Sequence, residues 1–484
     1  MIPRNFAPVL RKSLRLRTPL PLISNWVCRG CRANSTAAPP EHRLTEKPYY
    51  VTTPIFYVNA DPHVGHMYTM ILADVLKRWQ VLKGENAILC TGTDEHGLKV
   101  QQAAANADTP PREFCNKGAK TFKLLAETID MSNDHFVRTT DEDHKEAVQY
   151  FWYMLQERGF IYKTKHEGWY CVSDETFYPE STIEKRLDPA TGRTFLASKE
   201  TGKEVEWTSE SNYHFRLSSM RSRLLEFYAD NPEFIVPASE MRNVIKWVSD
   251  GLEDLSISRP VERLSWGIRV PGDDSQTIYV WLDALVNYIT KAGYPWAPEK
   301  KMAGGWPADV QVIGKDIVRF HCIYWPAFLL ALDLKPPKQI LVHGHWTLAL
   351  KKMAKSTGNV VNPFFAIERF GIDTMRWYLI HDGKDIRDSN YSNEQIVERY
   401  NKGLRSAIGN ILARISTTRL WSLKDCIMSR AEIESNPSSA AETSEFVKLL
   451  EELPRQVDNA MKELEPRKGL HQIMEVLYNI PQLE

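Results

Sequence analysis

Two histidines, His63 and His66, stand three residues apart, shortly after an apolar run that extends from Tyr49 to Val58. That spacing places both imidazoles on nearly the same side of a helix that begins there. Gly65, between them, has no side chain and lets a flat ring approach the backbone closely. A helix N-terminus offers free N–H groups and a positive dipole end, which suit a phosphate. The pattern predicts a phosphate-binding turn, although two structural histidines would look the same.

A second cationic element lies far along the chain, in Lys352-Met-Ala-Lys-Ser356 followed by Thr357-Gly358-Asn359. Two lysines three apart on a glycine-containing loop, Lys352 and Lys355, could swing over a polyphosphate. A charge-assisted hydrogen bond to phosphate contributes about 1.5–3 kcal/mol, and more where water is excluded. Taken alone, such a loop is more often a solvated surface.

The segment Thr91–Gly97 carries a carboxylate, Asp94, after a short apolar run that reads as a buried strand. Ligands of open α/β sheets bind at the carboxyl ends of the strands. Asp94 could therefore hold an ammonium group, whereas a simple capped turn remains the alternative.

Aromatic and branched residues crowd two later segments, Tyr279–Tyr288 and Gly314–Pro326, around the single histidine His321. Such residues could wall a pocket for an apolar, polarisable side chain such as a thioether. Ordinary aromatic core would give the same composition.

The elements that must position these residues follow from hydrophobic periodicity. A strand over Tyr49–Val58, a helix over Val64–Leu82 and a strand over Ala87–Thr91 predict a β-α-β start and a parallel sheet. The region from Lys163 to Asn212 reads as an inserted lobe with a hairpin near Asp188–Gly192. Further helices are expected at 111–129 and 142–158, further strands at Thr277–Trp281, Val310–Ile313 and Ile340–His343, and mostly helices from Glu394 onward.

The composition predicts an N-terminal targeting segment and argues against a membrane protein or a disulfide-rich protein. The 484 residues suggest more than one domain. Residues 1–40 hold seven Lys or Arg residues and no acidic one, which is typical of a mitochondrial transit peptide; a basic RNA-binding arm is the alternative. No stretch approaches the ~18 apolar residues of a membrane helix. The seven cysteines, including the Cys28 and Cys31 pair, suggest neither a disulfide framework nor a zinc site.

In this order, the motifs resemble class I aminoacyl-tRNA synthetases, most closely the methionyl-tRNA synthetases of mitochondrial or bacterial type, over roughly residues 48–480. The motifs that carry the resemblance are Thr53–Asn59 before His63–His66, Thr91–Gly97, Gly251–Arg259, Gly314–Ile317, Val342–His345 and Lys352–Ser356. The resemblance implies an α/β chain: a Rossmann-like doubly wound parallel sheet with an inserted connective lobe, followed by an all-α anticodon-binding helical domain. The expected boundaries are 1–45 for the transit peptide, 46–162 and 236–350 for the catalytic halves, 163–235 for the lobe, 351–393 for the lysine loop and stem-contact region, and 394–484 for the helical domain.

The resemblance also implies roles for individual residues. His63, His66, Lys352 and Lys355 would be catalytic, with Lys355 most important as pyrophosphate leaves, and Asp94 would take the ammonium group of methionine. Arg259 and Asp316 would form a supporting ion pair. ATP would further contact Asn59, Gly65 and Gly314; the methionine side chain would contact Ile55, Tyr57, Trp281, Ala284, Tyr288, Ile317 and His321; and the CAU anticodon would contact Asn410 and Arg414.

The implied reaction uses methionine, ATP with Mg²⁺ and tRNA(Met), and proceeds through methionyl-adenylate. We expect a monomer of the mitochondrial matrix, without a membrane segment. Three features depart from the family pattern. Ala354 replaces the usual serine, which should weaken the ordering of the loop modestly. The lobe keeps only Cys171, so no zinc is expected. The chain stops at Glu484, so the last helix is expected to be short and stacking on the anticodon weaker.

Two rival interpretations remain open. Another class I synthetase is disfavoured, because the lobe is too short for the editing domains of the leucine, isoleucine and valine enzymes, and a cysteine enzyme needs zinc ligands. A non-catalytic RNA-binding relative would be expected to lose His66 or Lys355, and both are present.

Overall fold

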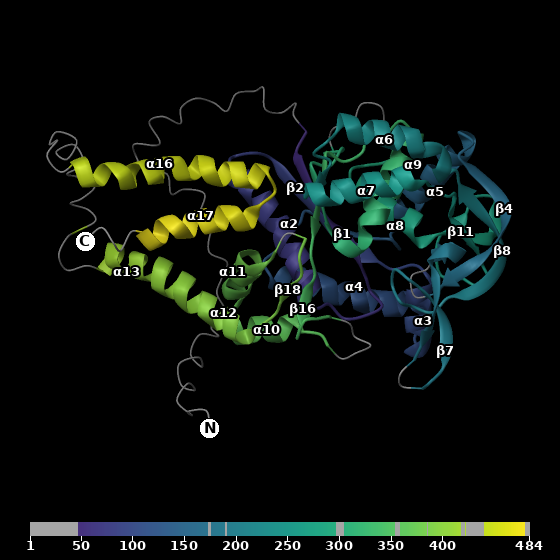
Figure 1. Cartoon of the computed structure of the whole chain (residues 1–484), viewed down its shortest axis with the longest axis horizontal. Coiled ribbons are helices and arrows are strands. Elements are labelled where there is room, and N and C mark those ends of the chain that lie inside the picture. Colours follow the sequence, from purple (N-terminus) through teal and green to yellow (C-terminus); the bar gives the residue numbers. More distant parts are fainter. Residues whose placement is uncertain are drawn as a thin grey trace. The chain divides into compact units, whose positions relative to one another are not determined.

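Six strands form a parallel sheet, of which Figure 1 labels β1 and β2. The computed structural model describes residues 47–172, 176–188, 191–296, 304–353, 359–384, 386–417, 422 and 440–479; the predicted transit peptide lies outside this range. The strands are ordered β3-β2-β1-β14-β15-β9. Their bounds are β1 Tyr49–Tyr57, β2 Ala87–Asp94, β3 His135–Arg138, β9 Ile235–Val236, β14 Val310–Gly314 and β15 Gln339–His343.

The order of the strands reverses direction between β1 and β14. These two strands lie next to each other and pair in parallel, although one ends at Tyr57 and the other begins at Val310. From β1 the chain moves outward through β2 to β3, and the later strands continue on the other side. A reversal of this kind leaves a crevice at the carboxyl ends of the two central strands, where α/β proteins bind ligands. The crevice is the position that the predicted site requires.

Helices join and cover these strands. Helix α2 (Val64–Leu82) packs against β1 and β2, and α11 (Ile372–Asp382) packs against α2. Helix α5 (Glu142–Glu157) packs against α8 (Val280–Thr290). Neighbouring residues of one strand enter different apolar clusters: Tyr50 joins one cluster and Val51 the other. Because successive side chains of a strand point to opposite faces, the two clusters cover the two faces of the sheet.

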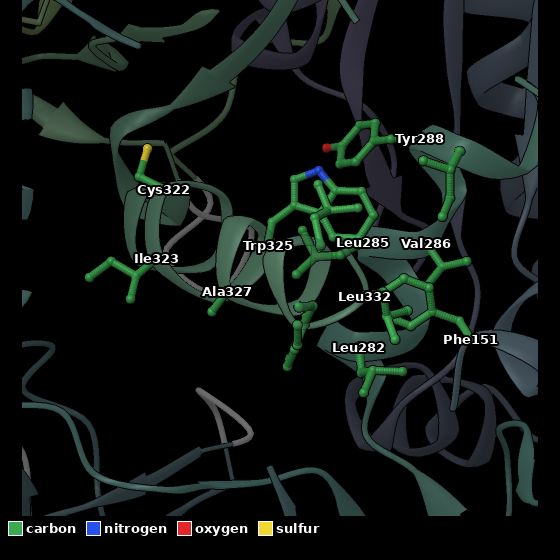
Figure 2. Close-up of a cluster of buried hydrophobic side chains, with 14 of the residues drawn as sticks. Phe151, Leu282, Leu285, Val286, Tyr288, Cys322, Ile323, Trp325, Ala327 and Leu332 are labelled. Atoms are coloured by element: carbon green, nitrogen blue, oxygen red, sulfur yellow. The ribbon is translucent and has the colours of Figure 1, made fainter. Parts of the chain in front are cut away.

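The cluster that includes α5 and α8 also includes α9 (Trp325–Ala331). Figure 2 shows some of its side chains, in which the ring of Trp325 lies 6.1 Å from those of both Tyr288 and Phe151. Trp325 and Phe151 are fully buried. This packing fixes the position of α8, and residues of α8 such as Trp281 and Ala284 line the cavity described below.

An antiparallel lobe follows α5, as predicted. Strands β4 (Ile161–Cys171) and β8 (Glu206–Phe215) form its long central pair, flanked by β5 (Thr176–Tyr178) and β10 (Leu255–Ser256). Strands β6 (Ile183–Leu187) and β7 (Thr194–Ser198) pair as a separate hairpin. Its turn contains Gly192 at φ 70°, a backbone conformation that glycine adopts without strain, and lies at the predicted position.

The C-terminal part is helical. Helices α10 (Pro363–Phe370) and α11 follow the short strands β16 (Trp346–Leu348) and β17 (Lys351–Lys352). After the short strand β18 (Ser389–Asn390) come α12 (Asn393–Arg399), a π-helical segment (Tyr400–Gly409), α13 (Asn410–Thr417), α16 (Ala440–Lys462) and α17 (Pro466–Asn479). Figure 1 shows α16 and α17 side by side, and residues of the two helices are in contact. The predicted fold class is confirmed. None of the helices within the described ranges is long and apolar enough to span a bilayer.

One predicted element is wrong. The strand expected over Thr277–Trp281 ends at Ile278 in β13 (Asp273–Ile278), and Trp281 lies in the first turn of α8. All but one of the α8 residues are buried, Trp281 being the partly exposed one. A helix that is buried on nearly every side shows no clear periodicity, and its sequence cannot be told from that of a buried strand.

Candidate active site

A cavity of about 630 Å³ opens at the carboxyl edge of the parallel sheet. Four strands each contribute their last residue to its wall: Tyr57 of β1, Asp94 of β2, Gly314 of β14 and His343 of β15. Residues from the start of α2 and from α8 complete the wall. Segments that are distant in sequence therefore share one cavity at the crevice that the strand order creates.

The two histidines of the first motif cap helix α2. His63 is the N-cap, and its Nδ1 atom accepts a hydrogen bond of 3.0 Å from the Gly65 N–H. The Nδ1 atom of His66 accepts one of 3.1 Å from the His63 N–H. This is the reciprocal arrangement of a capping box. In a neutral imidazole whose Nδ1 accepts, the proton resides on Nε2.

The rings of His63 and His66 stack with centroids 3.8 Å apart. Gly65 makes this possible, because a Cβ atom there would lie 2.8 Å from Cε1 of His63. Burial and the neighbouring His63 ring lower the pKa of His66 well below its ordinary value, against a weaker opposing effect of Asp316. His66 is thus held neutral at the N-terminus of a helix, and its ring lies on the same side as that of His63, as the spacing predicted.

A polar pair anchors the apolar part of the cavity. The hydroxyl group of Tyr288 lies 2.7 Å from Nε2 of His321, and Nδ1 of His321 lies 2.9 Å from the Ile317 carbonyl oxygen. The carbonyl can only accept, so Nδ1 carries the proton and Nε2 accepts from Tyr288. Burial lowers the pKa of His321 to about 4, although the Ile317 hydrogen bond and Asp316 oppose it. His321 is therefore neutral at pH 7.

The remaining wall of this part is apolar. The indole ring of Trp281 stacks on Phe320 at 3.7 Å and meets Tyr57 edge-on at 6.4 Å. Asp94 is buried and lies at the end of β2 on the same cavity. The residues that the sequence assigns to methionine all line this cavity, namely Ile55, Tyr57, Asp94, Trp281, Ala284, Tyr288, Ile317 and His321.

The second cationic motif approaches the same cavity. Strand β17 pairs with β16 and ends at Lys352, and Met353 lines the cavity. On the far side of the motif, Val360 and Asn362 line it as well. Ala354 and Lys355 lie outside the described residues, and the structure does not describe the Lys352 side chain. The contacts predicted for the two lysines stay predictions.

Several polar residues of the wall were not assigned to the ligand from the sequence, among them Thr69, Asp316, His343 and His345. His343 pairs through Nε2 with Thr69 Oγ1 at 2.9 Å, and burial lowers its pKa to about 4. Nε2 of His345 lies 3.0 Å from Oδ1 of Asp316. The signal was present: His343 ends a buried strand and His345 lies two residues beyond it, the place where α/β proteins position ligand-binding residues.

Other expectations fall elsewhere in the structure. The Arg259 guanidinium lies over the rings of Tyr170, Phe177 and Tyr279, at 5.1, 5.3 and 4.8 Å. Its predicted ion pair with Asp316 stays a prediction. Asn410 and Arg414 lie four residues apart on α13, and both are exposed.

Within the described ranges, no three His, Cys, Asp or Glu residues are grouped so as to hold a metal ion. Cys90, Cys115, Cys171 and Cys322 are buried, and none of these four residues forms a disulfide. Burial raises the pKa of Cys90 and of Cys115 to about 12, so neither supplies a thiolate near neutral pH.

Comparison with known proteins places this site in a family. Residues 49–416 match the family described as tRNA synthetases class I (M). The chain is 56% identical over 470 residues to a probable mitochondrial methionine–tRNA ligase of Neurospora crassa, covering 93% of this chain and 76% of the relative. It is 48% identical over 374 residues to the mitochondrial methionine–tRNA ligase of Homo sapiens, covering 77% of this chain and 62% of the relative.

A solved structure agrees with this. Mycobacterium tuberculosis methionyl-tRNA synthetase in complex with methionyl-adenylate superposes with a TM-score of 0.81 at 38% identity, covering 90% of this chain and 83% of that chain. The chain belongs to the class I aminoacyl-tRNA synthetases, in the family of the methionine type (M).

Proposed function

We propose that the chain is a methionine–tRNA ligase of the mitochondrial matrix, which joins methionine to tRNA(Met) through methionyl-adenylate. One observation carries the proposal: the capped histidine pair, the Asp94 carboxylate and the Trp281 pocket line the same cavity, which the strand before the lysine loop also approaches. Relatives named mitochondrial methionine–tRNA ligases, and a relative solved with methionyl-adenylate, support it.

In the first step, a carboxylate oxygen of methionine attacks the α-phosphorus of ATP, and the bond to the bridging oxygen of pyrophosphate breaks. The Nε2–H groups of His63 and His66 and the N-terminus of α2 stabilise the charge that develops on the phosphate. Lys352 and Lys355 neutralise the departing pyrophosphate together with Mg²⁺ as part of the substrate. Asn59, Gly65 and Gly314 lie along adenosine. Catalysis is then positioning and charge stabilisation, without a covalent nucleophile.

Recognition of the amino acid divides between two ends of the cavity. The Asp94 carboxylate takes the ammonium group, and the pocket of Trp281, Ala284 and Tyr288 takes the thioether side chain. A neutral pocket of this kind separates close analogues by only about 1–3 kcal/mol per methylene. We therefore expect homocysteine to be activated to a small extent.

In the second step, a terminal ribose hydroxyl group of the tRNA attacks the acyl carbon, and AMP leaves. We assign the catalytic halves to 46–162 and 236–350, the connective lobe to 163–235, stem contact to 351–393 and anticodon binding to 394–484. Asn410 and Arg414 on one side of α13 would contact the anticodon. We propose a monomer without structural zinc.

Methionine-dependent exchange of labelled pyrophosphate into ATP tests the proposed function. The purified chain should catalyse exchange with methionine, require Mg²⁺ and charge tRNA(Met). Lys355→Ala should lose most of the exchange. No exchange with any amino acid, together with retained tRNA binding, would overturn the proposal in favour of a non-catalytic RNA-binding protein.

The assignment to the matrix has its own test. A fluorescent fusion to residues 1–45 should enter mitochondria and become protected from protease in mitoplasts, whose outer membrane has been opened. A fusion to residues 46–484 should stay outside. Import without residues 1–45 would contradict the proposed leader.

A further inference from the structure

Behind the pocket lies a buried carboxylate that the proposed reaction does not use. Asp283 of α8 receives one imidazole on each oxygen: Nδ1 of His96 lies 2.7 Å from Oδ2, and Nε2 of His144 lies 2.8 Å from Oδ1. The side chains of His96, Asp283 and His144 are 4%, 1% and 0% exposed. Burial alone would raise the pKa of Asp283, but the two imidazoles outweigh it and hold the pKa below its ordinary value, so Asp283 is an anion.

The three residues of this triad, His96, Asp283 and His144, come from three different elements of the fold. His96 belongs to the loop after β2, two residues beyond Asp94. Asp283 belongs to α8 and is the immediate neighbour of Ala284, which lines the cavity. His144 belongs to the first turn of α5, which packs along α8. The triad therefore joins the loop that carries the ammonium-binding carboxylate to the helix that carries the side-chain pocket.

The same loop is held independently on its other side. The guanidinium of Arg138 donates to both oxygens of Glu95, at 2.6 and 2.8 Å. Thr140 Oγ1 also donates to Glu95, at 2.5 Å, and Trp266 Nε1 donates to the Glu95 carbonyl oxygen at 2.6 Å. Glu95 thus fixes the loop to β3, whereas His96 fixes it to α8. Asp94 precedes these two anchors directly, so its position depends on both.

An α-amino acid substrate spans the two elements that the triad joins. Its ammonium group must meet Asp94 while its side chain fills the pocket of Trp281, Ala284 and Tyr288. We propose that His96, Asp283 and His144 are positioning residues that set the separation between Asp94 and this pocket, and thereby the length of side chain that the enzyme accepts. The inference rests on the proposed function and adds to it the determinant of amino-acid length.

The experiment measures pyrophosphate exchange with methionine and with ethionine, its S-ethyl homologue, in Asp283→Ala, His96→Ala and Asp283→Asn. In the two alanine variants the KM for methionine should rise by about tenfold or more, because a displacement of about 1 Å can cost on the order of a hundredfold. The KM for ATP should stay within about twofold. The preference for methionine over ethionine in kcat/KM should fall.

Asp283→Asn is the conservative rescue. An amide of the same shape can accept from one imidazole and donate to the other, so this variant should recover most of the methionine KM and of the preference over ethionine. The matched control is Lys291→Ala, which removes the ion pair with Asp143, 2.6 Å long, between the ends of the same two helices. It should leave both KM values unchanged.

The outcomes separate the two proposals. A wild-type chain without methionine-dependent exchange would overturn the proposed function. If the wild type is active but the folded alanine variants keep the methionine KM and the preference over ethionine, and lose only thermal stability, the inference alone is overturned. If Asp283→Ala does not fold, His96→Ala carries the test, because it leaves the Asp283–His144 hydrogen bond in place.

Discussion

The hydroxyl group of Tyr288 donates a hydrogen bond of 2.7 Å to His321, whose other ring nitrogen donates to the Ile317 carbonyl oxygen at 2.9 Å. The backbone thus selects the tautomer of His321, and the tautomer selects the direction of the Tyr288 hydroxyl. Two elements of the pocket, α8 and the segment after β14, are locked together by one imidazole.

Tyr288→Phe removes only the donor of this pair. Because a buried acceptor left without its donor costs about 1–3 kcal/mol, the KM for methionine should rise by about fivefold or more in pyrophosphate exchange, with the KM for ATP unchanged. Tyr153→Phe, at a half-exposed residue of α5, is the control and should behave as wild type. Equal KM values for methionine in Tyr288→Phe and wild type would show that the hydrogen bond between Tyr288 and His321 does not contribute to methionine binding.

His66→Ala removes one of the two neutral N–H donors at the start of α2. Loss of a donor aimed at transition-state charge lowers kcat by roughly a hundred- to a thousandfold, and we expect this in exchange at saturating methionine. His63→Ala should lose activity and also thermal stability, since it removes the helix cap. A His66→Ala enzyme with wild-type kcat would contradict the proposed role.

Gly65→Ala tests the close approach of the His63 ring. The added Cβ atom would lie 2.8 Å from Cε1 and 2.9 Å from Nδ1 of His63, so the ring must move and the KM for ATP should rise. Gly469→Ala is the matched helical control, because the nearest atom to its new Cβ lies 3.4 Å away. If both variants keep the wild-type KM for ATP, the position of the His63 ring that ATP binding requires does not depend on Gly65.

The stability of the protein should fall at mildly acidic pH. Folding lowers the pKa of both His321 and His343 from 6.5 to about 4. Between these pH values the unfolded chain binds more protons than the folded chain. The contribution of the two histidines to the free energy of unfolding is therefore fully present above pH 6.5 and is lost as the pH falls towards 4. Each histidine contributes at most about 1.4 kcal/mol per pH unit.

Urea unfolding at several pH values measures this effect. The His321→Gln variant should show a shallower dependence in the same window. An unfolding free energy that is flat from pH 6.5 to pH 4 would mean that both imidazoles are protonated in the folded chain.

Ala354→Ser restores the hydroxyl that the family usually has in the lysine loop. One hydroxyl hydrogen bond contributes about 0.5–1.5 kcal/mol, less than a lysine–phosphate contact. Single-turnover adenylate formation should therefore be modestly faster or unchanged. A large loss of rate would contradict this interpretation of the loop.

Local patterns predicted much of the fold and of the site. Helix α2 was predicted with its observed bounds, because apolar spacing, a cap and a terminal glycine all agree there. The cavity wall was predicted through motifs at the ends of strands. Trp281 was placed in a strand, because a helix buried on all sides has no amphipathic signal.

The Asp283 triad could not be predicted from the sequence. Asp283 is 187 residues from His96 and 139 from His144, and no local spacing pattern links the three residues. Packing of α5 against α8 brings His144 to Asp283, and the loop after β2 brings His96 to it. The same holds for the tautomers of His63 and His66, which depend on backbone N–H groups of a formed helix cap.

A crystal structure of the chain with a non-hydrolysable methionyl-adenylate analogue tests the central claim most directly. The ligand should occupy the cavity at the carboxyl edge of the sheet, with the phosphate beside Nε2 of His63 and His66, the ammonium group on Asp94 and the thioether against Trp281. A ligand bound in another cavity, or a phosphate out of reach of both histidines, would contradict the account.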